Sequence, residues 1–316
     1  MNADIFSEWL RRQGHKVYRT ESTYWYNAGP RVLQAFPYHW LINPGKKELR
    51  SLMLNNGILA LRYSSPYDSD EGKLSYHIVQ NNCYDISTLN SKARNGVRRG
   101  LECFRIENIS FVRLAKEGWY LQEDTLIRQN RQKSMNKQQW ERLCLAAQDL
   151  PGFEVFAAFS GKELAAAVIA CRIDNIFNIP FAMSHCSFLR NHVNNALFFT
   201  LCCDLLKREN VSGVFFTVQS LDAPANVDEF KIRMGFEPKM VRQNIAVHPF
   251  IRPLITKPVH YLTNKIYKRY PSSNFLAKTE GLIRFYLEGN RPDSEQSLPV
   301  FLKDERSMAE HFATIP

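Results

Sequence analysis

The sequence contains no hydrophobic run that approaches the roughly 20 residues needed by a membrane-spanning helix. Its first residues, MNADIFSEWL, carry acidic side chains where a secretory signal peptide has basic ones. These two absences argue against a membrane-spanning or exported protein. We therefore expect a cytoplasmic protein.

The seven cysteines form no Cys-x-x-Cys pair, and most of them lie in hydrophobic segments. Small buried side chains have this distribution, so neither a disulfide framework nor a metal site is expected. A glycine-rich phosphate fingerprint is also missing after every predicted strand. The sequence therefore does not predict a doubly wound nucleotide-binding fold.

The sequence is rich in positively charged residues and in hydrophobic residues. The 316 residues carry a net charge of +10, and 45% of them are hydrophobic, with 12% aromatic. This composition predicts a globular protein of two domains or two fused halves. The charge predicts an anionic partner, which can be a nucleotide phosphate, an RNA or an acidic membrane face.

The most hydrophobic predicted helix covers residues 194–209, NNALFFTLCCDLLKRE. Its apolar side chains lie on nearly every side, which predicts a buried helix. Asn194 and Asn195 are expected to cap its first turn, and a helix N-terminus of this kind can bind an anion. The alternative is an ordinary connection in which the asparagines only cap. Four predicted strands flank the helix, at residues 154–160, 163–174, 176–185 and 211–220.

The order of predicted elements indicates an α/β fold with a mixed sheet, also described as α+β. We divide the chain into an N-terminal half at residues 1–116, a second half at residues 117–250 and a basic helical extension at residues 251–316. The polar end of this extension is expected to be a mobile tail.

Two segments concentrate the positive charge. Residues 92–116 carry seven Lys or Arg against two Glu. Arg94 and Arg98 are four residues apart there and share a helix face, on which two guanidinium groups can bind phosphate or carboxylate oxygens. Residues 251–291 carry eight Lys or Arg against two Glu and predict basic amphipathic helices that contact a membrane or RNA. In both segments the alternative is a solvated basic face.

The order of elements in residues 152–249 resembles the GCN5-related N-acyltransferase (GNAT) superfamily, with a degenerate copy in residues 15–115. This resemblance implies two GNAT-like halves in tandem and an acyl-CoA donor, such as acetyl-CoA. It also implies that the strand at residues 176–185 diverges from its neighbour. The pantetheine arm would lie in that gap, and the pyrophosphate would contact the N-terminus of the buried helix.

The phosphate loop implied by the resemblance is LRNHVNNA, which assigns Arg190, Asn194 and Asn195 to cofactor binding. Arg190 matches the family pattern. Val193 and Asn195 occupy the family's glycine positions, where a side chain makes close backbone approach to a pyrophosphate harder.

Two further motifs resemble the FemAB-like acyltransferases, which join two GNAT-like folds in one chain. FKIRMG, which contains Lys231, resembles their Phe-Lys-x-x-aromatic-or-Met-Gly signature, and SKARNGVRRGLE resembles their Arg-Asn-x-x-Arg helix. Ordinary GNAT members often have a tyrosine, acting as general acid, where this chain has Lys231. Typical FemAB-like members use aminoacyl-tRNA to extend a peptidoglycan precursor, whereas BioF2-like relatives are known only as acetyltransferases.

Acyl transfer to an amine needs a neutral nucleophile and stabilisation of a tetrahedral oxyanion. Lys231 suits the oxyanion role as a positive charge near the end of the sheet. His185, at the end of the presumed donor strand, can accept the amine proton near neutral pH. The alternatives are a surface lysine and a structural histidine. Four further residues are assigned to substrate binding: Gln219, Ser220, Arg94 and Arg98.

The sequence thus predicts a cytoplasmic N-acyltransferase that acts by direct attack of an amine, without a covalent enzyme intermediate. The acceptor is a small molecule or a peptide amine, and no metal or stable protein partner is expected. Coenzyme A thioester and aminoacyl-tRNA both remain possible donors. From a different class, the chain can be a non-catalytic basic module that docks on a membrane or nucleic acid.

Overall fold

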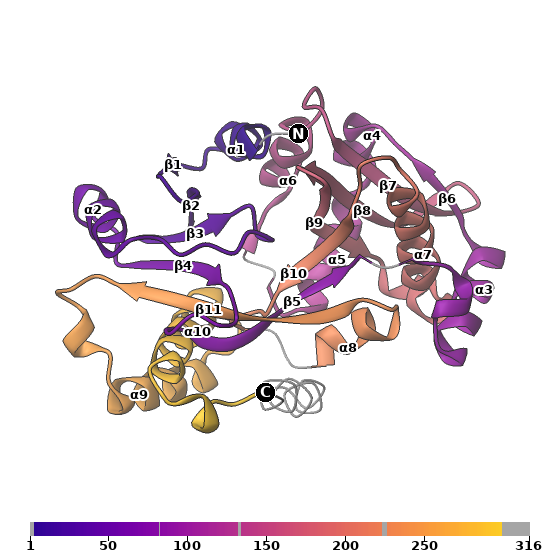
Figure 1. The fold of residues 1–316 in the computed structure, drawn as a ribbon. Coiled ribbons are helices and arrows are strands. Elements are labelled where there is room, and N and C mark those ends of the chain that lie inside the picture. Colours follow the sequence, from indigo (N-terminus) through magenta and orange to yellow (C-terminus); the bar gives the residue numbers. More distant parts are fainter. Residues whose placement is uncertain (1–2, 82, 132–133, 223–225, 299–316) are drawn as a thin grey trace.

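The computed structural model describes residues 3–81, 83–131, 134–222 and 226–298. Within these ranges eleven strands form one mixed sheet in the order β1-β2-β3-β4-β11-β5-β10-β9-β8-β7-β6 (Figure 1). The strands are β1 (Val17–Arg19), β2 (Tyr24–Gly29), β3 (Val32–Phe36), β4 (Ala60–Ser65), β5 (Lys73–Gln80), β6 (Arg105–Asn108), β7 (Phe153–Ser160), β8 (Glu163–Ile173), β9 (Ile176–Ser184), β10 (Gly213–Val218) and β11 (Glu237–Val247).

Helices cover both faces of this sheet, and short 3₁₀ turns link several elements. The helices are α1 (Ala3–Arg12), α2 (Lys46–Asn56), α3 (Ser91–Cys103), α4 (Phe111–Glu117), α5 (Trp119–Arg128), α6 (Lys137–Leu145), α7 (Val193–Leu206), α8 (Asn226–Arg233), α9 (Lys257–Arg269) and α10 (Asn274–Gly289). No helix in the described ranges is long and apolar enough to cross a membrane.

Strand β8 shows why its part of the sheet is covered on both faces. Its side chains alternate between two cores: Ala166 and Val168 pack with α7, and Ala167 and Ile169 pack with the layer of α1, α4 and α6. A strand buried on both sides reads as a nearly continuous apolar run, as ELAAAVIACRI does.

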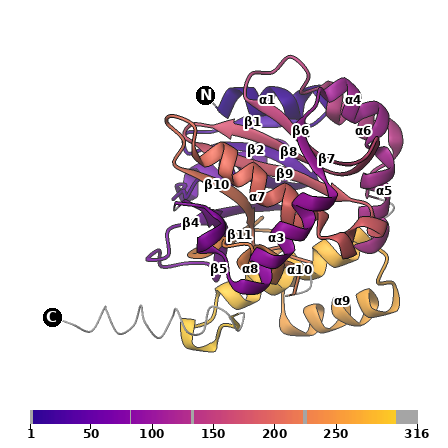
Figure 2. The ribbon, with the colours of Figure 1, turned by 90° about the vertical axis from the view of Figure 1, so that its right-hand side faces the viewer.

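The buried helix predicted from the sequence is α7, and its four flanking strands are confirmed as β7, β8, β9 and β10. Figure 2 shows α7 lying across the sheet with α3 beside it. The predicted asparagine caps are wrong. The N-cap is His192, in the left-handed region at φ 62°, and it makes no side-chain capping bond. The Asn195 amide instead lies 3.2 Å from the Met234 sulfur.

The two halves interlock rather than sit side by side. Strand β11, late in the sequence, lies between β4 and β5 and pairs antiparallel with both. In the opposite direction α1 packs on the second half, where the Trp9 indole donates to the Leu143 carbonyl at 3.1 Å. The domain boundaries at residues 116 and 250 therefore remain predictions, and the expected mobile tail falls largely beyond residue 298, outside the described ranges.

Candidate functional site

The central feature of the second half is a gap between the parallel strands β9 and β10. These strands pair only from Gly213↔Ile176 to Phe215↔Asn178. Beyond that point Pro180 has no N–H to donate to a neighbouring strand. The two strands therefore separate toward their C-terminal ends.

A cavity of about 240 Å³ occupies the start of this gap. Asn178 and Pro180 line it from β9, and residues 215–218 line it from β10. The first half closes it with polar groups, because Tyr38 and Arg62 also contribute to the wall. The cavity thus combines an apolar strand edge with hydroxyl, amide and guanidinium groups from the other half.

Arg62 is the one cationic residue in the cavity wall. Its Nε donates to Gln243 Oε1 at 2.8 Å, and Nη2 donates to the Gln219 carbonyl at 2.6 Å. Among the described residues, none places a carboxylate within ion-pair distance of it. Burial lowers its pKa to about 10, so it remains a cation at neutral pH. A half-buried cation whose hydrogen bonds go to neutral groups is suited to an anionic or developing negative charge.

Two histidines flank the cavity and are held neutral. His39 Nδ1 lies 3.1 Å from Asn178 Oδ1, so this nitrogen carries the proton and Nε2 is left as an acceptor. Burial lowers the His39 pKa, and burial lowers that of His77 to about 3. His39 is therefore a neutral base that is hydrogen-bonded to the cavity residue Asn178. The Nε2 atom of His77 forms a hydrogen bond with Ser64 Oγ at 2.8 Å.

Lys231, on α8, is buried beside the same gap. Its Nζ forms an ion pair with Asp228 and lies 4.6 Å from the ring centroid of Phe216, a cavity residue. The Tyr76 hydroxyl donates to the other oxygen of Asp228 at 2.6 Å. Burial lowers the Lys231 pKa against the opposing effect of Asp228. The surface-lysine alternative is therefore excluded, while the catalytic role stays a prediction.

Gln219 and Ser220 continue from β10 at the open end of the gap. Gln219 contacts Arg62 through its carbonyl and accepts from Ser75 Oγ at 2.8 Å through its side chain. Ser220 donates to Asp222, which pairs with Arg131 after α5. The Ser184 N–H at the end of β9 donates to Thr125 Oγ1 of α5. The Asp222–Arg131 ion pair therefore links the segment after β10 to the helix that contacts the end of β9.

The residues assigned to the phosphate lie elsewhere, around the first turn of α7. Asn194 and Asn195 belong to that turn, and the exposed Arg190 precedes it. Helix α3, which carries Arg94 and Arg98, packs directly against the same turn through its glycines. Arg190, Asn194 and Asn195 thus lie together at this turn, apart from the cavity that contains Arg62. Arg94 and Arg98 lie two residues along α3 from these glycines, on the opposite side of that helix.

This geometry can be compared with known structures. The FemX structure matches with a TM-score of 0.51 at 9% identity, over 78% of this chain and 92% of FemX. The C-terminal domain of a protein named as a lysylphosphatidylglycerol synthetase, from Agrobacterium fabrum, gives 0.50 at 8%, over 76% and 86%. A Bacteroides thetaiotaomicron protein of unknown function gives 0.52 at 11%, over 78% and 91%.

The chain has the FemX fold. This agrees with the fold that the resemblance of the motifs around Lys231 and Arg98 implied. Neither a protein-family profile nor a curated protein matches the sequence. At these identities the likeness concerns the fold, and the chemistry rests on the residues of this chain.

Within this FemX-like fold, α3 packs closely on the first turn of α7, and a substitution at Gly100 tests this contact. A Cβ added at Gly100 would lie 2.6 Å from the His192 carbonyl oxygen and 2.9 Å from Ala196 Cβ. Gly100→Ala is therefore expected to destabilise the protein by about 2 kcal/mol, because the two helices must move apart. The matched control is Gly29→Ala, where the added methyl meets nothing within 4 Å.

Chemical denaturation measures both free energies of unfolding. Equal stability of the two variants would show that α3 and α7 separate without cost, and would contradict the tight contact described above.

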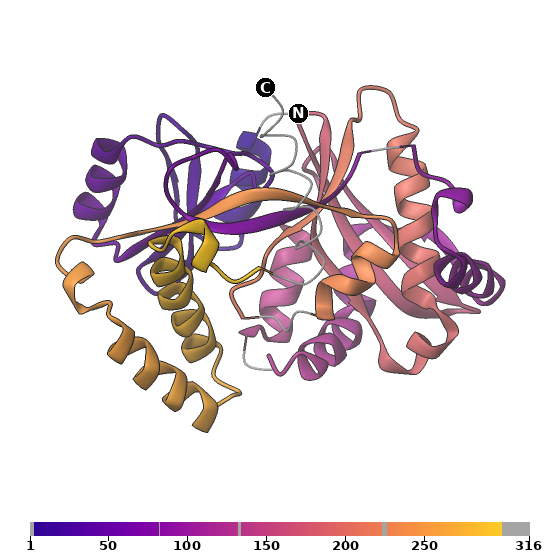
Figure 3. The same cartoon turned by 60° about the horizontal axis from the view of Figure 1, so that its bottom comes forward.

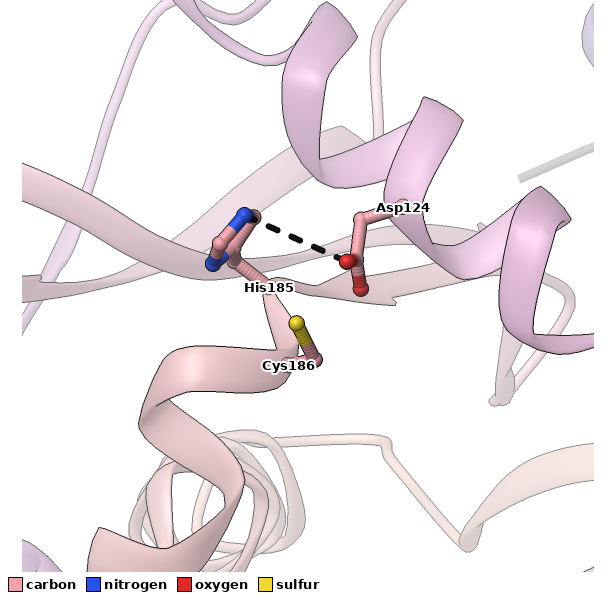
Figure 4. Close-up of side chains that lie close together, drawn as sticks. All are labelled: Asp124, His185 and Cys186. Carbon is pink, nitrogen blue, oxygen red and sulfur yellow. Dashed lines mark ion pairs between the residues drawn. The ribbon is translucent and has the colours of Figure 1, made fainter.

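His185 is not at the cavity described above. It follows β9 and lies beside Cys186 and beside Asp124 of α5. Figure 4 shows these three side chains facing one another. Their ligand atoms fall within 4.8 Å of one another, which is close enough for a metal ion. However, Arg128 already pairs with Asp124 at 2.7 Å and offsets the negative charge that a cation requires. We therefore assign no metal to this cluster.

The same cluster gives no support for a thiol nucleophile. The Cys186 thiol donates to Asp124, and this hydrogen bond raises its pKa, which favours the neutral thiol over the reactive thiolate. His185 Nδ1 is engaged with Ser187 Oγ at 2.7 Å. The predicted base role of His185 stays a prediction, and His39 is the histidine next to the cavity.

Sequence reasoning missed Arg62, His39 and the paired tyrosines Tyr26 and Tyr38, whose hydroxyls lie 2.8 Å apart. One signal was available. Arg62 interrupts the apolar strand pattern GILALRY, and a charged residue inside a strand core needs a partner or a function. His39 and the tyrosines lie in an aromatic segment that resembles ordinary core.

Proposed function

We propose that this protein is an acyltransferase that moves an acyl group onto an amine by direct attack, in the gap between β9 and β10. The observation that carries this proposal is the cavity in that gap with the half-buried Arg62, which has no carboxylate at ion-pair distance among the described residues. An acyl carbonyl that becomes an oxyanion is the kind of charge that such a site stabilises.

Each step of the transfer has a candidate group. The amine nitrogen attacks the acyl carbon while the positive charges of Arg62 and Lys231 stabilise the oxyanion. Nε2 of His39 accepts the proton that the amine loses. Attack forms the new C–N bond and the tetrahedral oxyanion. When the oxyanion collapses to a carbonyl, the bond to the leaving group breaks, and the protonated His39 returns its proton to the leaving oxygen or sulfur. Gln219, which bonds to Arg62, holds the guanidinium in place.

The contact between α3 and α7 supports a choice between the two donor classes. Coenzyme A is the donor that the superfamily resemblance predicts, with its pyrophosphate on the first turn of α7. In this chain Gly96 and Gly100 of α3 pack against that turn, and side chains occupy the glycine positions of the loop. These contacts leave a pyrophosphate little room and favour the second donor, an aminoacyl ester on tRNA. The net charge of +10 suits such a polyanion.

The donor can be tested by thermal unfolding with two probes. These are acetyl-CoA and a stable aminoacyl-tRNA mimic, 3′-deoxy-3′-aminoacylamino-adenosine. A ligand at about 100 times its dissociation constant adds roughly 2.7 kcal/mol to the free energy of unfolding. We expect the midpoint to rise with the aminoacyl mimic and not with acetyl-CoA.

A rise with acetyl-CoA alone would move the donor to the thioester and leave the acyl transfer intact. The absence of a shift with either probe would contradict the proposed function as a whole. Full-length aminoacyl-tRNA provides the second measurement, because its affinity should fall steeply with added salt.

A further inference from the structure

Helix α9 and its flanking turns form a surface without acidic residues. From Pro249 to Thr279 the sequence contains six Lys or Arg and no Asp or Glu. Figures 1 and 3 show α9 at the outer edge of the molecule, packed beside α10. None of the residues of α9 is fully buried. The segment thus lies at the periphery of the molecule, and its charged side chains are all cationic.

The side chains of α9 are arranged with the polar face inward. The half-buried positions are His260, Thr263, Asn264 and Tyr267, which follow the i, i+3, i+4, i+7 spacing of one helix face. His260 bonds to Glu280 of α10 at 2.9 Å. A helix that only packs on a protein body places its apolar stripe inward, so this orientation has another cause.

The apolar stripe of α9 faces outward. Val259, Leu262 and Ile266 keep 41%, 56% and 41% of their surface exposed. Four large apolar side chains before and after the helix are exposed as well: Phe250, Leu254, Tyr270 and, in the first turn of α10, Phe275. Lys257, Lys265, Lys268 and Arg269 lie on the same helix and are exposed. Exposed apolar patches with a cationic border mark sites of interaction.

We propose that this face, defined as α9 with residues 250–256 and 270–275, docks on an anionic phospholipid surface. Apolar side chains enter the boundary between headgroups and acyl chains, and the lysines and Arg269 contact lipid phosphates. A second copy of the chain fits this face poorly, because two cationic surfaces repel each other. Protein interfaces are also depleted in lysine, which this face contains three times on α9 alone.

We expect α9 to lie at the membrane surface rather than to cross the membrane. Helix α9 has 13 residues and a polar inner face, so its length and composition suit a helix that lies in the membrane plane. The face is separate from the cavity containing Arg62, and the inference is independent of the proposed acyl transfer.

The test is co-sedimentation of the full chain with vesicles of phosphatidylcholine alone and mixed with phosphatidylglycerol. We expect binding to the mixed vesicles that weakens with salt, and little binding to phosphatidylcholine. Lys265→Gln with Lys268→Gln should weaken binding by about thirtyfold, at the known contribution of a basic residue near an anionic membrane. Lys137→Gln with Lys162→Gln makes the same charge change on exposed sites elsewhere and should have little effect.

The apolar contribution is tested by Leu262→Glu with Ile266→Glu, which should abolish vesicle binding. Leu145→Glu, at an exposed position on α6, is the matched control. Circular dichroism verifies that each variant is folded.

Three outcomes would overturn the proposal. The first is no binding of the wild-type chain to mixed vesicles, and the second is equal binding by the α9 variants and their controls. The third is RNA binding or dimer formation that the α9 substitutions abolish while vesicle binding is absent. None of these outcomes bears on the thermal-unfolding test with acetyl-CoA and the aminoacyl-adenosine mimic.

Discussion

Arg62→Gln is expected to lower the rate constant kcat/KM for acyl transfer by about 10²–10³, the usual effect of removing one oxyanion donor. Arg62 is the cation of the cavity, and its guanidinium is held by the Gln219 carbonyl and the Gln243 side chain. Release of the donor's leaving group, measured with excess amine, gives the rate. Arg62→Lys keeps the charge but loses the two-point hold, so we expect it to recover only part of the rate.

Stability should behave differently from activity in the Arg62→Gln variant. A half-buried cation without a carboxylate at ion-pair distance costs free energy, so its removal should leave the free energy of unfolding unchanged or raise it. The control Arg11→Gln removes an exposed arginine whose pairing with Glu8 spans 4.0 Å, and it should alter neither quantity. An Arg62→Gln protein that is much less stable but fully active would show that Arg62 is structural.

Lys231→Ala is expected to destabilise the protein by about 3–5 kcal/mol and to abolish transfer. The substitution leaves the Asp228 carboxylate of α8 buried, with the Tyr76 hydroxyl of β5 as its described side-chain partner. Breaking a buried ion pair from one side has a cost of this size, because the remaining charge is uncompensated. Denaturant titration and the transfer assay measure the two effects separately.

The double variant Lys231→Met with Asp228→Asn separates the two roles of Lys231. It removes both charges of the buried pair, so most of the lost stability should return. Activity should not return, because the positive charge beside Phe216 is still missing. A double variant that regained stability and transfer together would refute a catalytic role and leave Lys231 as half of a structural ion pair.

Several parts of the fold were predictable because their signals are local. The helix at α7 is apolar on all sides, and its flanking strands are bounded by Ser160-Gly161-Lys162 and Asp174-Asn175 turns. Gly161 and Asp174 do adopt left-handed backbone conformations there, at φ 60° and 56°. The Lys231 motif predicted a positive charge near the end of the sheet, but neither the burial of Lys231 nor its ion pair with Asp228 was predicted.

Which residues form the candidate site was harder to predict from the sequence. His185 was chosen because it ends β9, but the end of that strand turns toward α5 and Asp124. The glycines of α3 were overlooked, since their effect depends on a neighbour nearly a hundred residues away in the sequence, at His192 and Ala196. Local patterns contain no information about such contacts.

By itself, the sequence determined the mixed α/β class, the buried helix and the concentration of positive charge in residues 251–291. These features follow from hydrophobic periodicity and composition, which can be assessed within short stretches of the sequence. Only the tertiary structure decided that Arg62 of β4 meets the edge of β10. The strand order β4-β11-β5-β10 depends on the insertion of β11 between two earlier strands. The hydrogen bonds that fix this insertion join residues far apart in the chain, so no local pattern encodes the cavity they create.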